Sequence, residues 1–240
     1  MRSGRKKRNI LKRILSRTVT VLFLVVAVWG AIVVVEGYSM YSNALERQGL
    51  EECVYSIRSK TNYTELNKLP QMYLDAVIAV EDGRFYKHCG IDLFSIGRAF
   101  LLDLTTWSLK EGGSTLTQQL AKNLYFTQKK QLSRKVAEVF MALDIEAAYS
   151  KDEILELYVN SIYFGDGYYC VRDASMGYFG VEPLQMEAYE CTMLAGVPNA
   201  PSLYSPSVNL ELAKERQHIV IQRMVECGYI TDKEAHMILY

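Results

Sequence analysis

The sequence predicts a mainly α-helical domain that follows one membrane-spanning helix, and three observations support this fold class. From residue 71 onward, apolar residues recur at spacings of three and four over long runs, whereas strand-like alternation is scarce. Residues 18–35 contain no charged residue and are rich in valine and leucine, so they are long enough to cross a bilayer. The 204 residues after residue 36 suit one compact domain.

The net charge of zero hides two unlike parts. Eight of the 27 lysines and arginines lie in residues 1–17, which contain no acidic residue, so residues 18–240 carry 19 basic against 27 acidic residues. A basic flank before the apolar run favours a cytoplasmic amino terminus and a domain on the outer side of the membrane. A cleaved signal peptide is the alternative, but the apolar run is long and shows no clear small-residue cleavage site. We therefore expect a basic arm at 1–17, a single-pass anchor at 18–36, a linker at 37–69 and a domain at 70–240.

The most chemically crowded stretch is EDGRFYKHCG at residues 81–90. The apolar segment before it and Gly83 after it place Glu81 and Asp82 near a helix C-terminus. The partial negative charge there disfavours ionised carboxylates and raises their proton affinity, which suits a general base near neutral pH. A solvated surface helix end is an equally weighted alternative from these residues alone.

A helix predicted from residue 116 follows two glycines, and Ser114 or Thr115 can cap it. Its unpaired backbone donors and positive dipole offer a phosphate site. The GKS/T ending of a nucleotide-binding loop is absent, so nucleotide hydrolysis is not expected. Polar residues follow at helical spacing: Gln118, Gln119, Lys122 and Asn123.

The next predicted helix carries Arg134 and Lys135, four and three residues before Glu138, so the three side chains can share one face. An ordinary surface ion pair is the alternative. The S-x-x-E pattern at residues 150–153 predicts a capping box with a structural role, and residues 231–234 signal another helix start. Aromatic residues between 158 and 179 are expected mostly in the core, although some could stack on sugar rings.

Residues 92–110 are unusually apolar, with phenylalanine and tryptophan beside leucines. An interfacial segment resting on the bilayer and a core helix are equally weighted readings of this composition.

Taken in order, these segments resemble the five motifs of glycosyltransferase family 51, the peptidoglycan glycosyltransferases. EDGRFYKHCG resembles the EDxxFxxHxG motif, GGSTLTQQLAKN the second motif and RKVAE the third. KDEILELYVNSIYFG is similar to the fourth motif and EAYECTMLAGVPNAPSLYSP to the fifth. The resemblance runs from about residue 70 to residue 228. It implies a lysozyme-like, mainly helical fold with a small membrane-associated jaw lobe that would include residues 92–110.

The resemblance also implies a reaction, the polymerisation of lipid II into β-1,4-linked glycan. The acceptor 4-hydroxyl attacks the donor anomeric carbon with inversion, and undecaprenyl pyrophosphate leaves. Glu81 would be the general base, with Asp82 and His88 arranging its surroundings. The remaining residues implied for substrate binding are Phe85 (by packing), Ser114, Thr115, Gln118, Gln119, Lys122, Asn123, Arg134 and Lys135, the last two on the pyrophosphate.

Glu138 matches the family's second carboxylate. It would either orient those cations or bind a divalent metal, Mg²⁺ or Mn²⁺, on the pyrophosphate, and no organic cofactor is implied. Cys170, Val171 and Asp173 depart from the family pattern beyond the fourth motif, which bears on the acceptor side.

The SxxK, SxN and KTG combination of a penicillin-binding transpeptidase is absent, so we expect a monofunctional enzyme. The implied partners are lipid II, the growing glycan strand, the cytoplasmic membrane, penicillin-binding transpeptidases and other cell-wall synthesis proteins, with no nucleic acid. One alternative is a lysozyme-like glycan-cleaving enzyme, although that reaction needs no pyrophosphate-binding cations. The other is an inactive membrane-tethered scaffold, which the intact Glu81 and Glu138 disfavour.

Overall fold

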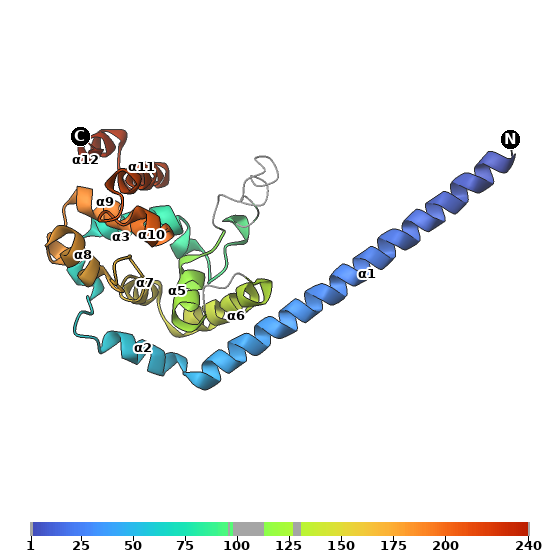
Figure 1. Ribbon diagram of the computed structural model, residues 1–240, viewed down its shortest axis with the longest axis horizontal. Coiled ribbons are helices and arrows are strands. Elements are labelled where there is room, and N and C mark those ends of the chain that lie inside the picture. Colours follow the sequence, from blue (N-terminus) through green and yellow to red (C-terminus); the bar gives the residue numbers. More distant parts are fainter. Residues whose placement is uncertain (1, 96, 98–112, 127–130, 240) are drawn as a thin grey trace.

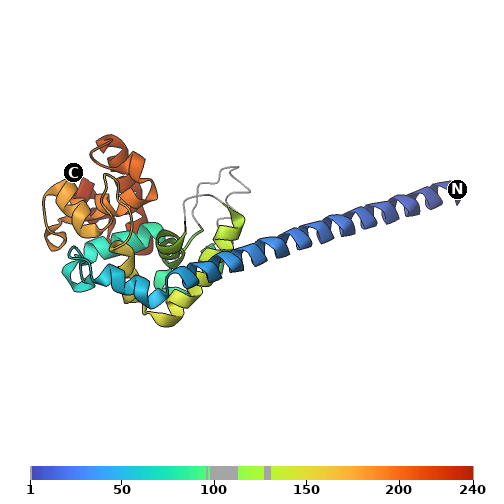
Figure 2. The same cartoon turned by 60° about the horizontal axis from the view of Figure 1, so that its bottom comes forward.

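The computed structural model describes residues 2–95, 97, 113–126 and 131–239, and the regular elements of these residues are helices (Figure 1). The predicted mainly α-helical fold class is therefore confirmed. The described part of the chain forms a helical domain from which helix α1 (Arg2–Arg47) projects as a long rod, as the two views in Figures 1 and 2 agree.

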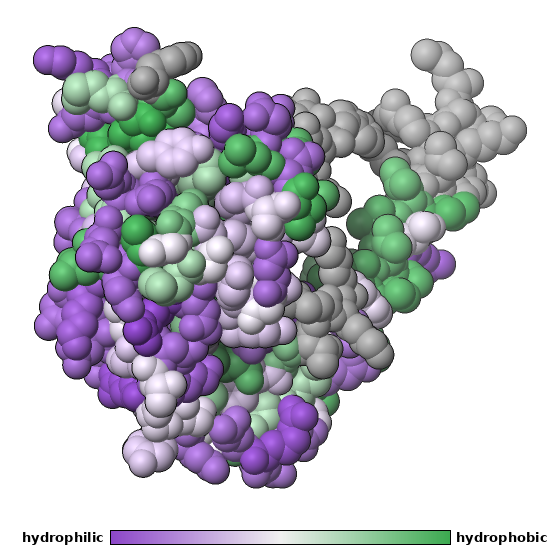
Figure 3. Space-filling model, turned by 60° about the vertical axis from the view of Figure 1, so that its left-hand side comes forward, coloured by the Kyte–Doolittle hydropathy of each residue, from purple (hydrophilic) through white to green (hydrophobic). Residues whose placement is uncertain are grey.

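Helix α1 contains the predicted membrane span. From Ile14 to Arg47 it is long and apolar enough to cross a membrane, and its valine, leucine and phenylalanine side chains at residues 19–28 are exposed. Large apolar side chains that find no cover in their own protein suit a lipid environment. The face of the domain turned forward in Figure 3 is by contrast largely hydrophilic.

The stretch at residues 37–69 differs from the expected linker, because it is folded. Helix α1 continues to Arg47, and α2 (Leu50–Arg58) and η1 (Leu66–Lys68) follow. Cys53, Val54 and Ile57 share the buried face of α2 and add to the domain core. Most residues of this stretch are polar. The apolar residues of α2 nevertheless recur at helical spacing, and this spacing lets one face of the helix pack on the domain.

The last turns of α1 pack closely on α6 (Leu132–Ala148). A Cβ atom on Gly37 would lie 2.6 Å from Val136 Cβ, so only glycine permits this approach. Tyr38 meets the Phe140 ring edge to face, with 5.4 Å between ring centroids, and the Tyr41 hydroxyl donates a hydrogen bond to Asp144. The membrane helix and α6 therefore form one packed unit.

The core surrounds α3 (Gln71–Glu81), which packs against α9 (Ala188–Gly196) and α11 (Leu210–Cys227). Helix α5 (Leu116–Tyr125) lies between α6 and α7 (Lys151–Val159). Large side chains without exposed surface fill the space between these helices: Tyr73, Phe85, Leu116, Leu120, Met141, Tyr158 and Phe164.

The remaining elements complete the periphery: η2 (Phe85–Lys87), α8 (Val171–Phe179), η3 (Pro183–Gln185), η4 (Val197–Asn199), α10 (Pro201–Tyr204) and α12 (Asp232–Leu239). The predicted capping box is present, since the side chains of Ser150 and Glu153 each bond the other's backbone. Thr231 and Glu234 make the same reciprocal contacts at the start of α12.

Only residues 92–95 and 97 of the apolar segment 92–110 are described, and Leu93 and Phe94 there are exposed. The remaining residues of this segment lie outside the described residues. The predictions of an interfacial segment, a core helix and a jaw lobe therefore stay predictions.

Candidate active site

Glu81 is the last residue of α3, as predicted, but it is not a surface residue. Its side chain is 8% exposed, and Gln119 Nε2 donates a hydrogen bond of 2.6 Å to its Oε2. Burial raises the pKa of Glu81, while the Gln119 hydrogen bond and the charges of Arg216 and Lys122 lower it. The surface alternative is therefore wrong. The proton affinity of Glu81 is raised, as predicted, but burial is the main cause rather than the helix dipole.

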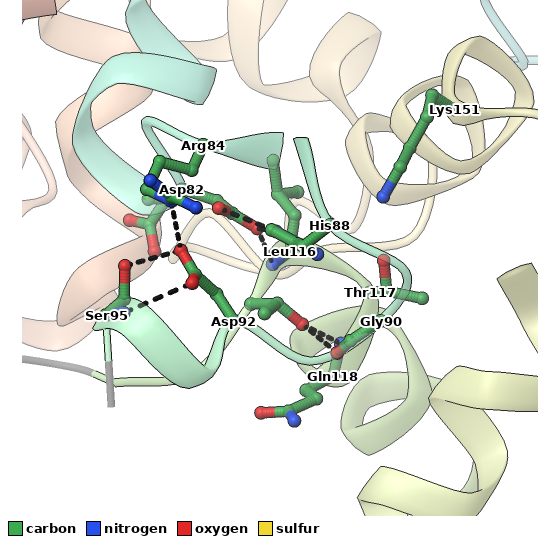
Figure 4. Close-up of polar contacts among 12 residues, drawn as sticks. Asp82, Arg84, His88, Gly90, Asp92, Ser95, Leu116, Thr117, Gln118 and Lys151 are labelled. Atoms are coloured by element: carbon green, nitrogen blue, oxygen red, sulfur yellow. Dashed lines mark hydrogen bonds and ion pairs between the residues drawn. The ribbon is translucent and has the colours of Figure 1, made fainter. Parts of the chain in front are cut away.

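The neighbouring carboxylate, Asp82, joins the first and second motifs (Figure 4). His88 Nε2 lies 3.0 and 2.9 Å from its two oxygens, and the Leu116 backbone N–H donates to Oδ2 at 3.0 Å. The N-terminus of the helix that starts at Leu116 was predicted to bind a phosphate. In the structure it binds the Asp82 carboxylate instead.

Thr115, rather than Ser114, is the N-cap of α5. Its hydroxyl accepts a hydrogen bond from the Gln118 N–H at 3.2 Å and donates one to the Gly90 carbonyl at 2.7 Å. Gly90 has a φ of +75°, and a Cβ there would lie 3.2 Å from the Ala142 carbonyl oxygen. The loop of the first motif is consequently held against both α5 and α6.

Two of the residues implied for substrate binding, Phe85 and Gln118, are buried. Phe85 has no exposed surface and lies under the Lys151 ammonium, 4.4 Å from its ring centroid, which agrees with a packing role. Gln119, Lys122 and Asn123 keep partial exposure on α5.

A cationic cluster lies on α5 and α6. Arg134 Nε and Lys135 Nζ each lie 2.9 Å from a different oxygen of Glu138, which is 1% exposed. Lys135 also donates to Ser114 Oγ at 2.6 Å. The ordinary surface ion pair is therefore excluded, since the side chains of Glu138 and Arg134 are only 1% and 13% exposed.

Lys122 connects the two halves of the site electrostatically. Burial lowers its pKa, Glu138 and Glu81 raise it, and Arg134 and Lys135 lower it. The charges of both carboxylates and both cations therefore act on Lys122. Helix α5, which carries Lys122, also holds Gln119 against Glu81 and packs on α6, the helix of Arg134, Lys135 and Glu138.

The surroundings of Glu138 do not fit a divalent metal. Both of its oxygens are paired with cations, which would repel a metal ion. Within the described residues, no three side chains of histidine, cysteine, aspartate or glutamate gather in a way that could hold one. The geometry supports the other role of Glu138, which is to orient Arg134 and Lys135.

The site contains one residue that the sequence analysis missed. Arg216 of α11 is 12% exposed, and its Nη2 lies 3.9 Å from Glu81 Oε1. The sequence around Arg216 has the pattern of an ordinary charged helix, so no local signal marked this arginine as part of the site.

The fold and the site together define a class: a membrane-anchored, helical enzyme that has a buried carboxylate beside a cationic, anion-binding cluster.

Comparisons with known proteins narrow this class. The family model described as Transglycosylase matches residues 50–225. A transglycosylase homologue of Cupriavidus necator is 43% identical over 183 residues, which cover 76% of this chain and 79% of that protein. Penicillin-binding protein 1F of Bacillus subtilis is 46% identical over 170 residues, which cover 71% of this chain and 24% of that protein.

The solved structure of penicillin-binding protein 1A from Haemophilus influenzae matches with a TM-score of 0.44 and 24% identity, over 74% of this chain and 17% of that one. The chain thus spans less than a quarter of the penicillin-binding proteins it resembles. The family model covers most of the chain, so the chain belongs to the transglycosylase family, the peptidoglycan glycosyltransferases of glycosyltransferase family 51.

Proposed function

We propose that this protein polymerises lipid II into β-1,4-linked glycan strands and releases undecaprenyl pyrophosphate. The observation that carries the proposal is the pairing of Glu81, a buried carboxylate with a raised pKa, with the cluster of Lys122, Arg134 and Lys135. A base of this kind suits deprotonation of a hydroxyl, and fixed cations suit a departing pyrophosphate.

In the proposed step, Glu81 takes the proton of the acceptor 4-hydroxyl. The O4–C1 bond forms as the bond between C1 and the pyrophosphate oxygen breaks, which inverts the donor anomeric carbon. The electron pair of the broken bond leaves with the pyrophosphate, and Glu81 later returns its proton to solvent. Glu81 Oε2 is held by Gln119 at 2.6 Å, which leaves Oε1 to accept the proton.

The leaving group would be received by α5 and α6. Lys135 is fixed by Glu138 and Ser114, and Arg134 by Glu138, so their orientation is set before the substrate binds. Cations arranged in advance stabilise developing charge without reorganisation. The proposed pyrophosphate site is bordered by partly exposed polar side chains: Ser114, Gln119, Lys122 and Asn123.

The proposed setting is the bacterial cytoplasmic membrane. The basic residues before the apolar part of α1 support a cytoplasmic amino terminus and an extracytoplasmic domain. Similarity to penicillin-binding proteins supports a place in cell-wall synthesis. The proposed partners are lipid II, the growing strand and the transpeptidases that cross-link it.

The test uses the full chain purified in detergent, given either labelled lipid II or preformed uncross-linked glycan. We expect lipid II to become long, muramidase-sensitive glycan with one undecaprenyl pyrophosphate released per bond formed, and preformed glycan to stay intact. Shortening of the preformed glycan would instead indicate a glycan-cleaving enzyme. No turnover of either substrate would indicate an inactive scaffold.

A further inference from the structure

Arg216 occupies a built position beside the proposed base. A Cβ on Gly196 of α9 would lie 2.9 Å from Arg216 Cγ, so glycine is needed there for the arginine stem to pass. The Tyr204 ring of α10 lies under the guanidinium, with 5.9 Å between the guanidinium carbon and the ring centroid. Contacts from two other elements therefore direct this side chain toward Glu81.

The two oxygens of Glu81 have different surroundings. Oε2 accepts the hydrogen bond from Gln119 Nε2, and the Tyr158 hydroxyl reaches the other end of the same amide, 3.4 Å from Gln119 Oε1. Oε1 is buried, has no hydrogen-bond partner and faces Arg216 Nη2 at 3.9 Å. Buried polar atoms normally have partners, so an oxygen left open beside a fixed guanidinium indicates a functional position.

We infer that Arg216 is a positioning residue for the base: its guanidinium keeps Glu81 ionised and fixes Oε1 as the oxygen that accepts the acceptor's proton. The inference rests on the proposed function for the identity of that proton. A distance of 3.9 Å is too long for a direct hydrogen bond but short enough for a strong charge interaction at low dielectric. The carboxylate can thus be stabilised as an anion while Oε1 stays open to the hydroxyl.

Other groups also act on Glu81. Asp82 beside it raises its pKa, whereas Lys122 of α5 lowers it. Tyr158 of α7 is buried, and its own pKa is raised well above the usual value. Helix α9, which also packs on α3, contributes apolar side chains and the buried Cys191 thiol. Among the described residues, Arg216 is the cation whose ion-pair contact with Glu81 is direct.

The experiment measures the titration of Glu81 in the full chain in detergent. Carboxyl carbons of ¹³C-labelled glutamate are followed by NMR, and the Glu81 signal is assigned by its loss in Glu81→Gln. We expect Arg216→Met to raise the apparent pKa of this signal and Arg216→Lys to restore it. Arg172→Met is the matched control, because it removes an arginine whose partner, Glu182, lies at the surface.

The same variants are assayed on lipid II from pH 5 to pH 9. Loss of the guanidinium should move the acid limb to higher pH, so the rate at pH 6 relative to pH 8 should fall, by at most about tenfold for a limb that moves by about one pH unit. Gly196→Ala, which displaces the arginine stem, should shift the limb in the same direction by less.

Unchanged Glu81 titration in a folded Arg216→Met protein would overturn the inference, and so would a failure of Arg216→Lys to restore it. A shifted titration in a wild-type protein that does not polymerise lipid II would leave the Arg216 assignment standing and overturn the proposed function instead.

Discussion

The carboxylate of Asp82 accepts a hydrogen bond from the backbone N–H of Leu116 at 3.0 Å, across 34 residues of chain, and so caps α5, the helix that contains most of the second motif. The same carboxylate pairs with His88. One side chain therefore fixes the loop of the proposed base to the helix that carries Gln119 and Lys122.

Replacing Asp82 tests this structural role. Asp82→Ala leaves His88 and the Leu116 N–H without their buried partner, and both side chains of the pair are only 5% exposed. We expect a loss of about 3 kcal/mol in the free energy of unfolding, measured by urea denaturation in detergent. Asp152→Ala, which removes an exposed carboxylate bonded to Tyr86, should cost less than about 1 kcal/mol. Equal losses in the two variants would contradict the assignment.

The junction of α1 and α6 gives a second prediction. Gly37→Ala forces a methyl group to within 2.7 Å of the Ser133 carbonyl oxygen and should destabilise the domain by about 2 kcal/mol. Gly30→Ala is the control, because a Cβ at Gly30 meets nothing within 4 Å. Thermal unfolding of the full chain measures both, and a Gly37→Ala protein as stable as the Gly30→Ala protein would rule out close packing of these helices.

The helices and their caps could largely be predicted from sequence, because they depend on local patterns. The apolar segment before Glu81 and Gly83 after it predicted the end of α3, and S-x-x-E predicted the capping box at Ser150. Residues 37–69, whose polar composition and weak periodicity predict a linker, are largely helical, because the apolar face of α2 packs into the domain core. Long-range partners are not encoded locally, so neither the Asp82 contact with Leu116 nor Arg216 beside Glu81 could be read in advance.

The raised pKa of Glu81 leads to a prediction about stability. A carboxyl whose pKa is higher in the folded than in the unfolded protein binds its proton more tightly when folded, so stability falls as pH rises from the ordinary carboxyl value through the folded pKa. At pH 7 the buried Glu81 carboxyl therefore costs stability. Glu81→Gln should raise the melting temperature at pH 7, and this gain should shrink on acidification toward pH 4. A gain that does not change with pH would argue against a buried, ionised carboxylate.

Replacing Glu138 by glutamine tests whether its carboxylate orients Arg134 and Lys135. Glu138→Gln keeps the shape but loses the charge that orients Arg134 and Lys135 at 2.9 Å. We expect kcat on lipid II to fall about 100-fold through misplacement of these cations, with little change in the circular dichroism spectrum. Glu153→Gln, at the exposed capping box, serves as the control and should retain activity. Normal kcat in Glu138→Gln would show that the cations need no such support.

The most direct test of Glu81 as the general base compares the rate of lipid II polymerisation by Glu81→Gln with that of the wild-type chain, at equal amounts of folded protein in detergent. Glutamine keeps an oxygen and the size of the side chain but cannot take a proton at neutral pH. We expect polymerisation to be abolished, while the variant unfolds at or above the wild-type temperature at pH 7. Glycan formation at the wild-type rate by a folded Glu81→Gln protein would contradict the assignment of Glu81 as the base.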